Sequence, residues 1–471
     1  MADKYDLVVV GAGPGGYAAA LRGAQLGFKT ACVERERPGG ICLNWGCIPT
    51  KALLKSADMM RHAQHAADYG VIINGPITFD WDKVIARSRG VAEKMSSGID
   101  FLFKKYGVTH LPGTARLTGR GKLEVESAVA EKSAGKLNLE TPRTILATGA
   151  RAKFLPGIEP DGDRIITYRE AMILPEVPKS MVVIGAGAIG IEFADFWNAF
   201  GVDVTVIEFM PRILPIEDED ISASLTRILK KKGMKILTGT KTTGMKVDGK
   251  TVTTSYVGAD GQEQTITSDR VLLAVGVRAN VEGIGLEGMG VALDRGFIQV
   301  DDQYRTTSPG IWAIGDCAGP PALAHVATAE AVRTVEAMAG KHVVPIDYDA
   351  IPGCTYCDPE VASIGKTEAQ AREAGLDIAV GKFPFNVNGK AVGAGHLDGF
   401  IKVIVDKGNH DRVVGVHCIG YGVTDLIAEI STAMASEATG HEILAAIHPH
   451  PTLSEVMMEA TGVAMGEAFH I

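Results

Sequence analysis

The 471-residue sequence lacks any unbroken apolar run of about 18 residues, so no membrane-spanning helix is expected. It also lacks a basic excess. The 47 Lys and Arg residues are outnumbered by 56 Asp and Glu, and the net charge of -9 argues against nucleic acid or an anionic membrane surface as a partner. Aromatic residues make up only 6%, yet 46% of the chain is apolar and 22% charged, which is typical of a globular protein. Glycine is abundant, with 56 residues, and indicates many turns and close backbone approaches.

Cysteine is scarce: seven residues, an odd number, are scattered along the chain. This is typical of a reducing compartment, where a closely spaced pair indicates redox or metal chemistry. The uncharged stretch 7–21 has the length of a signal-peptide core, but Asp3 and Asp6 stand where a basic leader would be and glycines interrupt the run. We therefore expect a cytoplasmic protein.

One supersecondary pattern occurs twice: an apolar strand, a G-x-G-x-x-G turn, a small-residue helix, and a second strand that ends in an acid. In both copies the acid follows the first glycine by 23 positions. The first copy comprises Gly11, Gly13, Gly16 and Glu34, and the second comprises Gly185, Gly187, Gly190 and Glu208. In such a unit the glycines allow a tight turn, close approach of the backbone to a pyrophosphate and helix–strand packing, while the acid accepts bonds from a ribose. Two copies predict two dinucleotide sites.

Further strands that end in glycine, 144–149 and 271–276, are expected to close the two units. Asp316 follows another β-run and a glycine, where it could meet a ligand hydroxyl or cap a helix. From residue 348 onward strands alternate with helices. We therefore predict an α/β protein with two Rossmann-like dinucleotide-binding domains, residues 1–150 and 151–276, a central domain, 277–346, and a C-terminal α+β domain, 347–471.

Cys42 and Cys47 follow the first unit, with Gly46 between them and a helical pattern over 52–67 beyond. They can close a small disulfide ring, and the helix dipole and neighbouring cations are expected to lower a thiol pKa there. One alternative is a zinc site shared with Cys354 and Cys357, and another is a pair of inert thiols. A dithiol beside a dinucleotide fold favours redox chemistry and no metal.

The segment 42–51, Cys-Leu-Asn-x-Gly-Cys-Ile-Pro-Thr-Lys, resembles the redox motif of the flavin-dependent pyridine nucleotide disulfide oxidoreductases. The resemblance covers essentially the whole chain, and the segment 448–455, His-Pro-His-Pro-Thr-Leu-Ser-Glu, is similar to the branch that oxidises dihydrolipoamide. It implies FAD at the first fingerprint, NAD at the second and a homodimer formed through the C-terminal domain. A glutathione reductase-like activity is the alternative, which Glu208 disfavours because its charge would repel the 2′-phosphate of NADP.

The resemblance also implies roles for single residues. Cys42 would be the outer thiol that exchanges with lipoyl sulfur, and Cys47 the inner thiol that exchanges electrons with the flavin, from which they pass to NAD+. His450 would be the acid/base, since imidazole titrates near neutrality, and Glu455 would orient it. A capping box from Thr452 to Glu455 is the local alternative. The other residues expected at the cofactors are Lys51, Thr148, Gly149, Glu192, Gly276, Asp316, Ala324 and His325.

Several features qualify this assignment. Lys51 is implied to pair with Glu192 beside the flavin, although an exposed lysine is the plainer alternative. His448, two positions from His450, is expected to point to the opposite side. Trp45 is a variable position inside the dithiol loop and is expected to alter access to the outer thiol. Because no lipoyl-type domain precedes the first strand, the lipoyl group is expected on a partner, a lipoylated acyltransferase or a glycine cleavage carrier protein.

Overall fold

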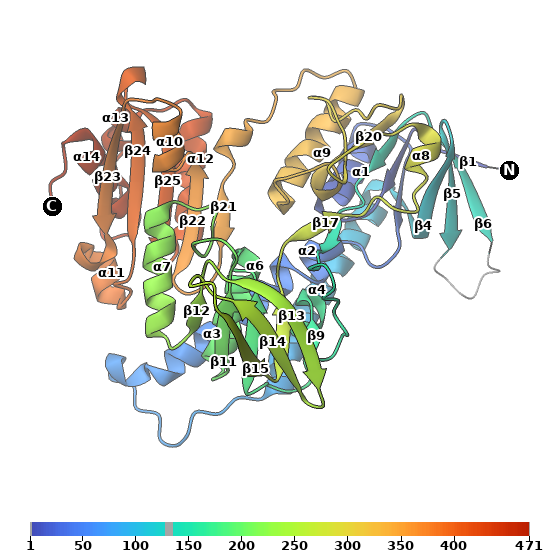
Figure 1. The fold of residues 1–471 in the computed structure, drawn as a ribbon. Helices are drawn as coiled ribbons and strands as arrows, with labels where there is room; N and C mark the ends of the chain where they lie inside the picture. The colour runs from blue at the N-terminus through green and yellow to red at the C-terminus, as the bar shows by residue number, and fades with distance from the viewer. Residues whose placement is uncertain (1, 128–134, 471) are drawn as a thin grey trace. The chain divides into compact units, whose positions relative to one another are not determined.

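The computed structural model, drawn in Figure 1, describes residues 2–127 and 135–470. The chain divides into two compact units. Unit 1 comprises Met1–Leu53, Asp82–Lys153 and Gly276–Ile346. Unit 2 comprises Leu54–Trp81, Phe154–Val275 and Asp347–Ile471.

Unit 1 is built on an eight-stranded sheet of order β1-β6-β5-β4-β3-β2-β7-β20. Strands β4, β3, β2, β7 and β20 run parallel, and β4, β5 and β6 form an antiparallel extension. The strands are β1 (Asp3–Lys4), β2 (Leu7–Val10), β3 (Thr30–Glu34), β4 (Thr109–Gly119), β5 (Lys122–Ser127), β6 (Lys136–Glu140), β7 (Thr144–Leu146) and β20 (Ile311–Ala313), with β8 (Ala150–Ala152), β17 (Val277–Ala279), β18 (Leu293–Asp294) and β19 (Phe297–Ile298) in small pairs. The helices are α1 (Pro14–Gln25), α2 (Gly40–Asn44), the start of α3 (Cys47–Gln64), α4 (Trp81–Tyr106, of which residues from 82 belong here), α8 (Leu286–Met289), the short η2 (Gly315–Cys317) and α9 (Ala324–Met338).

The core of unit 1 lies on both faces of the parallel strands. Strand β2 is buried throughout because alternate side chains serve opposite faces. Leu7 and Val9 pack in a cluster with residues of α1, α4 and α9, whereas Val8 and Val10 pack in a second cluster with residues of β4, β5 and β6. This double burial explains the continuous apolar run in the sequence and fixes the loop after β2 between two packed layers.

Unit 2 contains a parallel five-stranded sheet of order β12-β11-β10-β16-β9 and an antiparallel three-stranded sheet, β13-β14-β15. Its elements here are β9 (Ile165–Ile166), α5 (Tyr168–Ala171), β10 (Ser180–Ile184), α6 (Ala188–Ala199), β11 (Asp203–Ile207), α7 (Glu219–Lys231), β12 (Lys235–Leu237), β13 (Lys241–Asp248), β14 (Thr251–Val257), β15 (Glu263–Ser268) and β16 (Arg270–Leu273), with η1 (Ala66–Tyr69) earlier in the chain. Val182, Ile184 and Leu273 share one hydrophobic cluster with Val252 and Tyr256 of β14. The antiparallel sheet therefore covers one face of the parallel sheet.

The C-terminal part of unit 2 is an antiparallel five-stranded sheet of order β21-β22-β25-β24-β23, drawn in orange in Figure 1. Its elements are η3 (Tyr348–Ala350), β21 (Gly353–Thr355), β22 (Glu360–Gly365), α10 (Glu368–Glu373), β23 (Ile378–Pro384), η4 (Phe385–Val387), α11 (Gly389–Ala394), β24 (Phe400–Asp406), η5 (Lys407–Asn409), β25 (Arg412–Gly420), α12 (Val423–Ala435), α13 (Gly440–Ala445) and α14 (Glu455–Met465). Apolar residues of α12 and α14, including Ile427 and Val456, form one core with the sheet. The predicted α+β texture is confirmed here.

One predicted boundary is wrong in a way that matters for the chemistry. The helix expected over 52–67 begins five residues earlier, at Cys47, as α3. Pro49 does not prevent this earlier start, because a proline in the first turn of a helix loses no hydrogen bond where the first amides have no intrahelical partner. Cys47 therefore stands at a helix N-terminus.

Candidate active site

The first glycine fingerprint leads from β2 into α1 in unit 1. Gly11 has φ +98°, and a Cβ added there would lie 2.3 Å from the Ala147 carbonyl oxygen, while one at Gly16 would lie 1.8 Å from the Gly11 carbonyl oxygen. A Cβ at Gly13 would meet only the Cα of Gly40, 3.9 Å away. The chain's own packing thus requires the first and third glycines, whereas the second borders open space. That is the position where a pyrophosphate needs to approach the backbone, so the residues fit a bound dinucleotide.

The second fingerprint, between β10 and α6 in unit 2, has the same geometry. Gly185 has φ +98° and a Cβ there would lie 2.4 Å from the Ala274 carbonyl oxygen; at Gly190 it would lie 2.0 Å from the Gly185 carbonyl oxygen. At Gly187 it would meet nothing within 4 Å. This cradle fits a second dinucleotide for the same reason.

The two acids that end β3 and β11 hold matching positions. Each acid is buried, and its carboxylate accepts two backbone N–H groups. One N–H belongs to the residue after the first glycine, and the other belongs to the residue two positions after the acid itself. For Glu34 the donors are Ala12 (2.7 Å) and Glu36 (2.8 Å). For Glu208 they are Ala186 (2.6 Å) and Met210 (2.7 Å). Each oxygen retains a lone pair that a ribose hydroxyl can use.

The dithiol segment lies in unit 1. Cys42 belongs to α2 and Cys47 is the first residue of α3, and both are free thiols. A hydrogen bond with Cys47 and burial raise the pKa of Cys42 well above its usual value, and Lys51 opposes this only in part. The predicted lowering of a thiol pKa is therefore wrong for Cys42, because the hydrogen bond with the second thiol raises the pKa by more than the charge of Lys51 lowers it. Cys47 is the more exposed of the two.

Two more side chains act electrostatically on the dithiol. Asp316, in η2, is largely buried, which raises its pKa, and its charge contributes to raising the pKa of Cys42. The pKa of Tyr17, in α1, is raised by burial and then by the charges of Cys42 and Cys47. Sequence reasoning missed Tyr17, because one tyrosine just after a glycine fingerprint gives no signal. The structure thus gathers Asp316 and Tyr17 at the predicted dithiol.

The remaining predicted residues of unit 1 lie on loops and a helix start after its parallel strands. The Thr148 hydroxyl donates to the Asn280 carbonyl oxygen (2.6 Å), and Gly149 follows with φ +68°. Gly276, with φ +99°, precedes β17, and Ala324 and His325 begin α9. These positions agree with a ligand site at the carboxyl ends of the parallel strands, but the roles of the residues stay predictions.

The two histidines near the C-terminus lie in opposite environments, as expected. The His448 side chain is 6% exposed, with Nε2 2.9 Å from a Glu429 oxygen, whereas the His450 side chain is 78% exposed. His450 Nδ1 lies 2.9 Å from Oε1 of Glu455. The other oxygen of Glu455 accepts the Thr452 N–H at 2.8 Å. The expected capping box is wrong, because α14 begins at Glu455 with Ser454 as its N-cap and without a side-chain cap, so Thr452 lies before the helix. The carboxylate contacts both the imidazole and the Thr452 N–H, and its orienting role stays a prediction.

Burial raises the pKa of Glu455, but hydrogen bonds from Thr452 and His450 outweigh it, and the net pKa is lowered. Glu455 is thus held as a carboxylate.

The predicted partner of Lys51, Glu192, is buried in α6 and accepts the Tyr356 N–H at 3.0 Å. The Lys51–Glu192 ion pair itself stays a prediction.

The alternative zinc site would also use Cys354 and Cys357 of unit 2. Within residues 2–127 and 135–470, no group of three His, Cys, Asp or Glu side chains could hold a metal ion. Cys357 is buried with its Sγ 3.2 Å from the Pro359 carbonyl oxygen, and burial raises its pKa well above the usual value. Such a thiol is packed and not reactive.

The comparisons with known proteins agree with this geometry. Residues 5–331 match the model of the pyridine nucleotide-disulphide oxidoreductases, and residues 351–461 match the dimerisation domain of the same proteins. The chain belongs to this family. Its predicted fold class is confirmed, and so are a flavoprotein oxidoreductase and the cofactors FAD and NAD. The dimerisation domain supports the predicted homodimer.

Two curated relatives, both named dihydrolipoyl dehydrogenase, match over the full length of this chain and of their own. The protein from Rhizobium etli is 47% identical and the one from Bacillus subtilis is 42% identical. Among solved structures, LpdA from Mycobacterium tuberculosis has a TM-score of 0.89 at 26% identity, covering 98% of this chain and 99% of that one. RclA from Escherichia coli, at 24% identity and a TM-score of 0.86, covers 98% and 100% and shows the fold.

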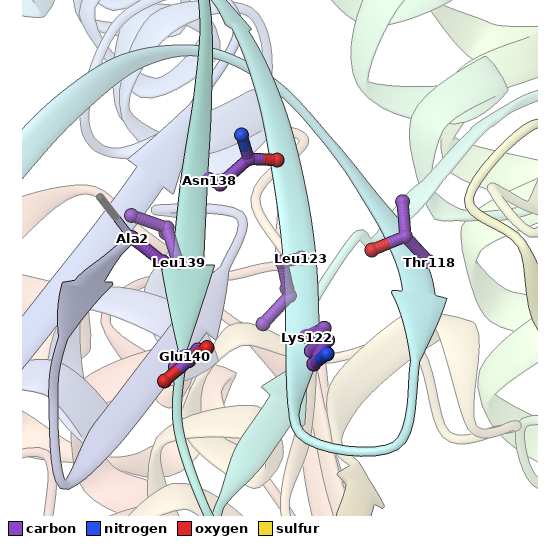
Figure 2. Close-up of a pocket in the computed structure, with 7 residues that line it drawn as sticks. All are labelled: Ala2, Thr118, Lys122, Leu123, Asn138, Leu139 and Glu140. Carbon is purple, nitrogen blue, oxygen red and sulfur yellow. The ribbon is translucent and has the colours of Figure 1, made fainter.

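One pocket lies apart from the predicted site residues. A pocket of about 330 Å³ opens on β4, β5 and β6, where Figure 2 shows Lys122, Asn138 and Glu140; its described lining includes none of the predicted site residues. In the described part of the chain, no helix is long and apolar enough to cross a membrane.

Proposed function

We propose that this family member oxidises protein-bound dihydrolipoamide and reduces NAD+, with Cys42 and Cys47 as its redox-active pair. Full-length relatives at 41–47% identity are named dihydrolipoyl dehydrogenase, which bears out the predicted reaction. The observation that supports the residue roles is the thiol pair at the start of α3, linked by a hydrogen bond and joined by Tyr17 and Asp316.

Cys42 and Cys47 enter the reaction as a disulfide. A dihydrolipoamide thiolate attacks Cys42, which forms a mixed disulfide and releases Cys47 as a thiolate. The second substrate thiolate then attacks the lipoyl sulfur, so that lipoamide leaves and Cys42 regains a thiol. The substrate loses two electrons and two protons, and the enzyme disulfide gains the two electrons. FAD held at the first fingerprint would supply the route by which these electrons pass from the dithiol to NAD+.

His450 removes the protons of the substrate thiols. Because the Glu455 carboxylate accepts a hydrogen bond from Nδ1, the neutral ring carries its proton there, and Nε2 has a lone pair ready for a thiol proton. The exposure of the ring leaves Nε2 accessible to a substrate. We assign the ring to the site of the other subunit of the homodimer, an assignment that depends on the family resemblance.

The fingerprints are assigned to different cofactors. Gly11, Gly13, Gly16 and Glu34, with Asp316, Thr148, Gly149, Gly276, Ala324 and His325, would hold FAD; Gly185, Gly187, Gly190 and Glu208 would hold NAD. In this assignment Lys51 and Glu192 pair beside the flavin, and the domains run over 1–150, 151–276, 277–346 and 347–471. The lipoyl group is carried by a lipoylated acyltransferase or a glycine cleavage carrier, and the reducing cytoplasm is the expected compartment.

The test uses two single variants, Cys47→Ser and His450→Ala. Each parent should have lost dihydrolipoamide-dependent NAD+ reduction. When the two proteins are dissociated and reassociated, random mixing makes half of the dimers mixed, and each mixed dimer has one site with both residues intact. About a quarter of wild-type activity should then return by the two-fold symmetry. If tagged mixed dimers form without regaining activity, His450 serves its own chain; if Cys47→Ser protein keeps full activity, the dithiol role is wrong.

A further inference from the structure

Helix α4 is tied to the dithiol segment through side-chain donors, a connection within unit 1. Four of its side chains donate to backbone carbonyl oxygens of the segment 38–52: Arg87 to Ala52 (2.7 Å), Ser88 to Pro49 (2.9 Å), Arg89 to Asn44 (2.8 Å) and Ser96 to Pro38 (2.7 Å). Both serines are buried. Three of the four bonds reach residues outside the ring that the two cysteines would close, and the Arg89 bond reaches inside it.

Arg89 makes two contacts with the four residues that separate the cysteines. Its Nη1 donates to the Asn44 carbonyl oxygen, and its guanidinium lies 4.7 Å from the centre of the Trp45 ring. Partial burial lowers the pKa of Arg89, which reflects a guanidinium partly withdrawn from water. A cation over an indole face is attracted by the ring, and more strongly where water is displaced.

Asn44 gives this contact a rigid base. Its side chain is buried, and Nδ2 donates to the carbonyl oxygens of Pro38 (3.1 Å) and Gly40 (3.0 Å). The Trp45 N–H donates to the Ile41 carbonyl oxygen at 2.7 Å. The connection between Cys42 and Cys47 is therefore fixed at its backbone, and Arg89 joins it to a long helix that carries no redox residue.

We propose that Arg89 is a positioning residue for the Cys42–Cys47 pair and that it acts through Trp45 and the Asn44 carbonyl. This inference rests on the dithiol role proposed above. Closing a disulfide ring removes conformational freedom from the intervening residues, and a loop that is already held loses less. The contact therefore favours the disulfide over the dithiol and keeps Cys42 where a substrate thiolate can reach it.

The measurement is the fraction of Cys42–Cys47 disulfide at equilibrium with mixtures of lipoamide and dihydrolipoamide, read by alkylation and mass spectrometry of the purified holoenzyme. Arg89→Met and Trp45→Leu should each shift the equilibrium toward the dithiol by roughly threefold to tenfold. A tenfold shift in this two-electron couple corresponds to about 30 mV. The double variant should show little more than Arg89→Met alone, because that change already removes the contact with Trp45.

Two conservative variants and a matched control separate positioning from general stability. Arg89→Lys retains a cation and a donor, and Trp45→Phe retains an aromatic face, so both should recover part of the wild-type equilibrium. Arg87→Met removes a similar bond from the same helix to Ala52, outside the ring, and should stay within about twofold of wild type.

An Arg89→Met equilibrium equal to that of Arg87→Met would overturn the inference, and so would additive effects of Arg89→Met and Trp45→Leu. The readout counts disulfide and dithiol directly and does not use turnover. Failure of the proposed catalytic roles would be recognised separately, as full dihydrolipoamide activity in Cys47→Ser protein.

Discussion

Replacing Gly187 by alanine tests whether the second fingerprint binds the nicotinamide nucleotide. Gly187 has φ -72° and ψ -179°, a conformation that alanine adopts without strain, and an added Cβ would meet nothing of the protein within 4 Å. Gly187→Ala should therefore leave folding intact or stabilise it by about 0.4–1 kcal/mol. The methyl group would instead occupy the approach of the pyrophosphate to the backbone. Losing one charge-assisted hydrogen bond, about 1.5–3 kcal/mol, would raise the KM for NAD+ roughly tenfold to a hundredfold.

The assay pairs initial rates at saturating dihydrolipoamide with thermal unfolding. Gly190→Ala is the matched control, because its Cβ would lie 2.0 Å from the Gly185 carbonyl oxygen and must displace backbone. That variant should lower Tm as well as nucleotide affinity, whereas Gly187→Ala should change affinity alone. A Gly187→Ala enzyme with an unchanged KM for NAD+ would refute the assignment of this cradle to the pyrophosphate.

Three further predictions follow from single carboxylates. Glu208 should make NAD the preferred nucleotide by about 1–3 kcal/mol, roughly tenfold to a hundredfold in kcat/KM; Glu208→Ala should narrow that ratio, and equal wild-type efficiency with NADP would contradict it. Glu455→Gln should lower kcat/KM for dihydrolipoamide about tenfold or more, because the charge-assisted bond to His450 is lost. The Tm of this variant shows whether the bond from the Thr452 N–H also contributes to stability. Unchanged kinetics would exclude the orienting role of Glu455. Burial raises the pKa of Glu217 from 4.5 to about 7, so in this range the folded state holds a proton that the unfolded chain releases. The free energy of unfolding should therefore fall as pH rises from about 4.5 to about 7, by about 3 kcal/mol in total. Glu217→Gln should remove that decline, so its Tm should exceed that of wild type at pH 8 and match it near pH 4; a constant difference at both pH values would contradict the linkage.

The fingerprints could be predicted because their constraints are local. A tight turn needs a glycine with positive φ, and close helix–strand contact needs another glycine five positions later, so the sequence itself records the geometry of Gly11 and Gly16. The second strand of the unit, predicted to end in the acid Glu208, is observed as Asp203–Ile207. Its apolar β-branched run between a glycine and an acid left little choice of boundary.

The dithiol's surroundings could not be predicted in the same way. Arg89 meets Asn44 across 45 positions of sequence, and an arginine on a long amphipathic helix looks like any solvated charge until the fold brings it to its partner. The start of α3 is equally open in the sequence, since Pro49 is typical of a loop as well as of a first helical turn. Only the structure decides between these alternatives, because for Arg89 and for Pro49 both structural roles are consistent with the neighbouring sequence.

The error over the thiol pKa shows why the base is needed. A helix N-terminus and Lys51 favour a thiolate, but two sulfurs within hydrogen-bond reach do not both lose their protons easily, since the first negative charge opposes the second. The hydrogen bond and the charge of Cys47 therefore raise the pKa of Cys42 by more than Lys51 lowers it. In the disulfide form that meets the substrate, neither sulfur is a thiolate that could accept the protons that dihydrolipoamide must release before it attacks. They need an acceptor outside the pair, and the exposed imidazole of His450, with its tautomer set by Glu455, has the free nitrogen for that purpose.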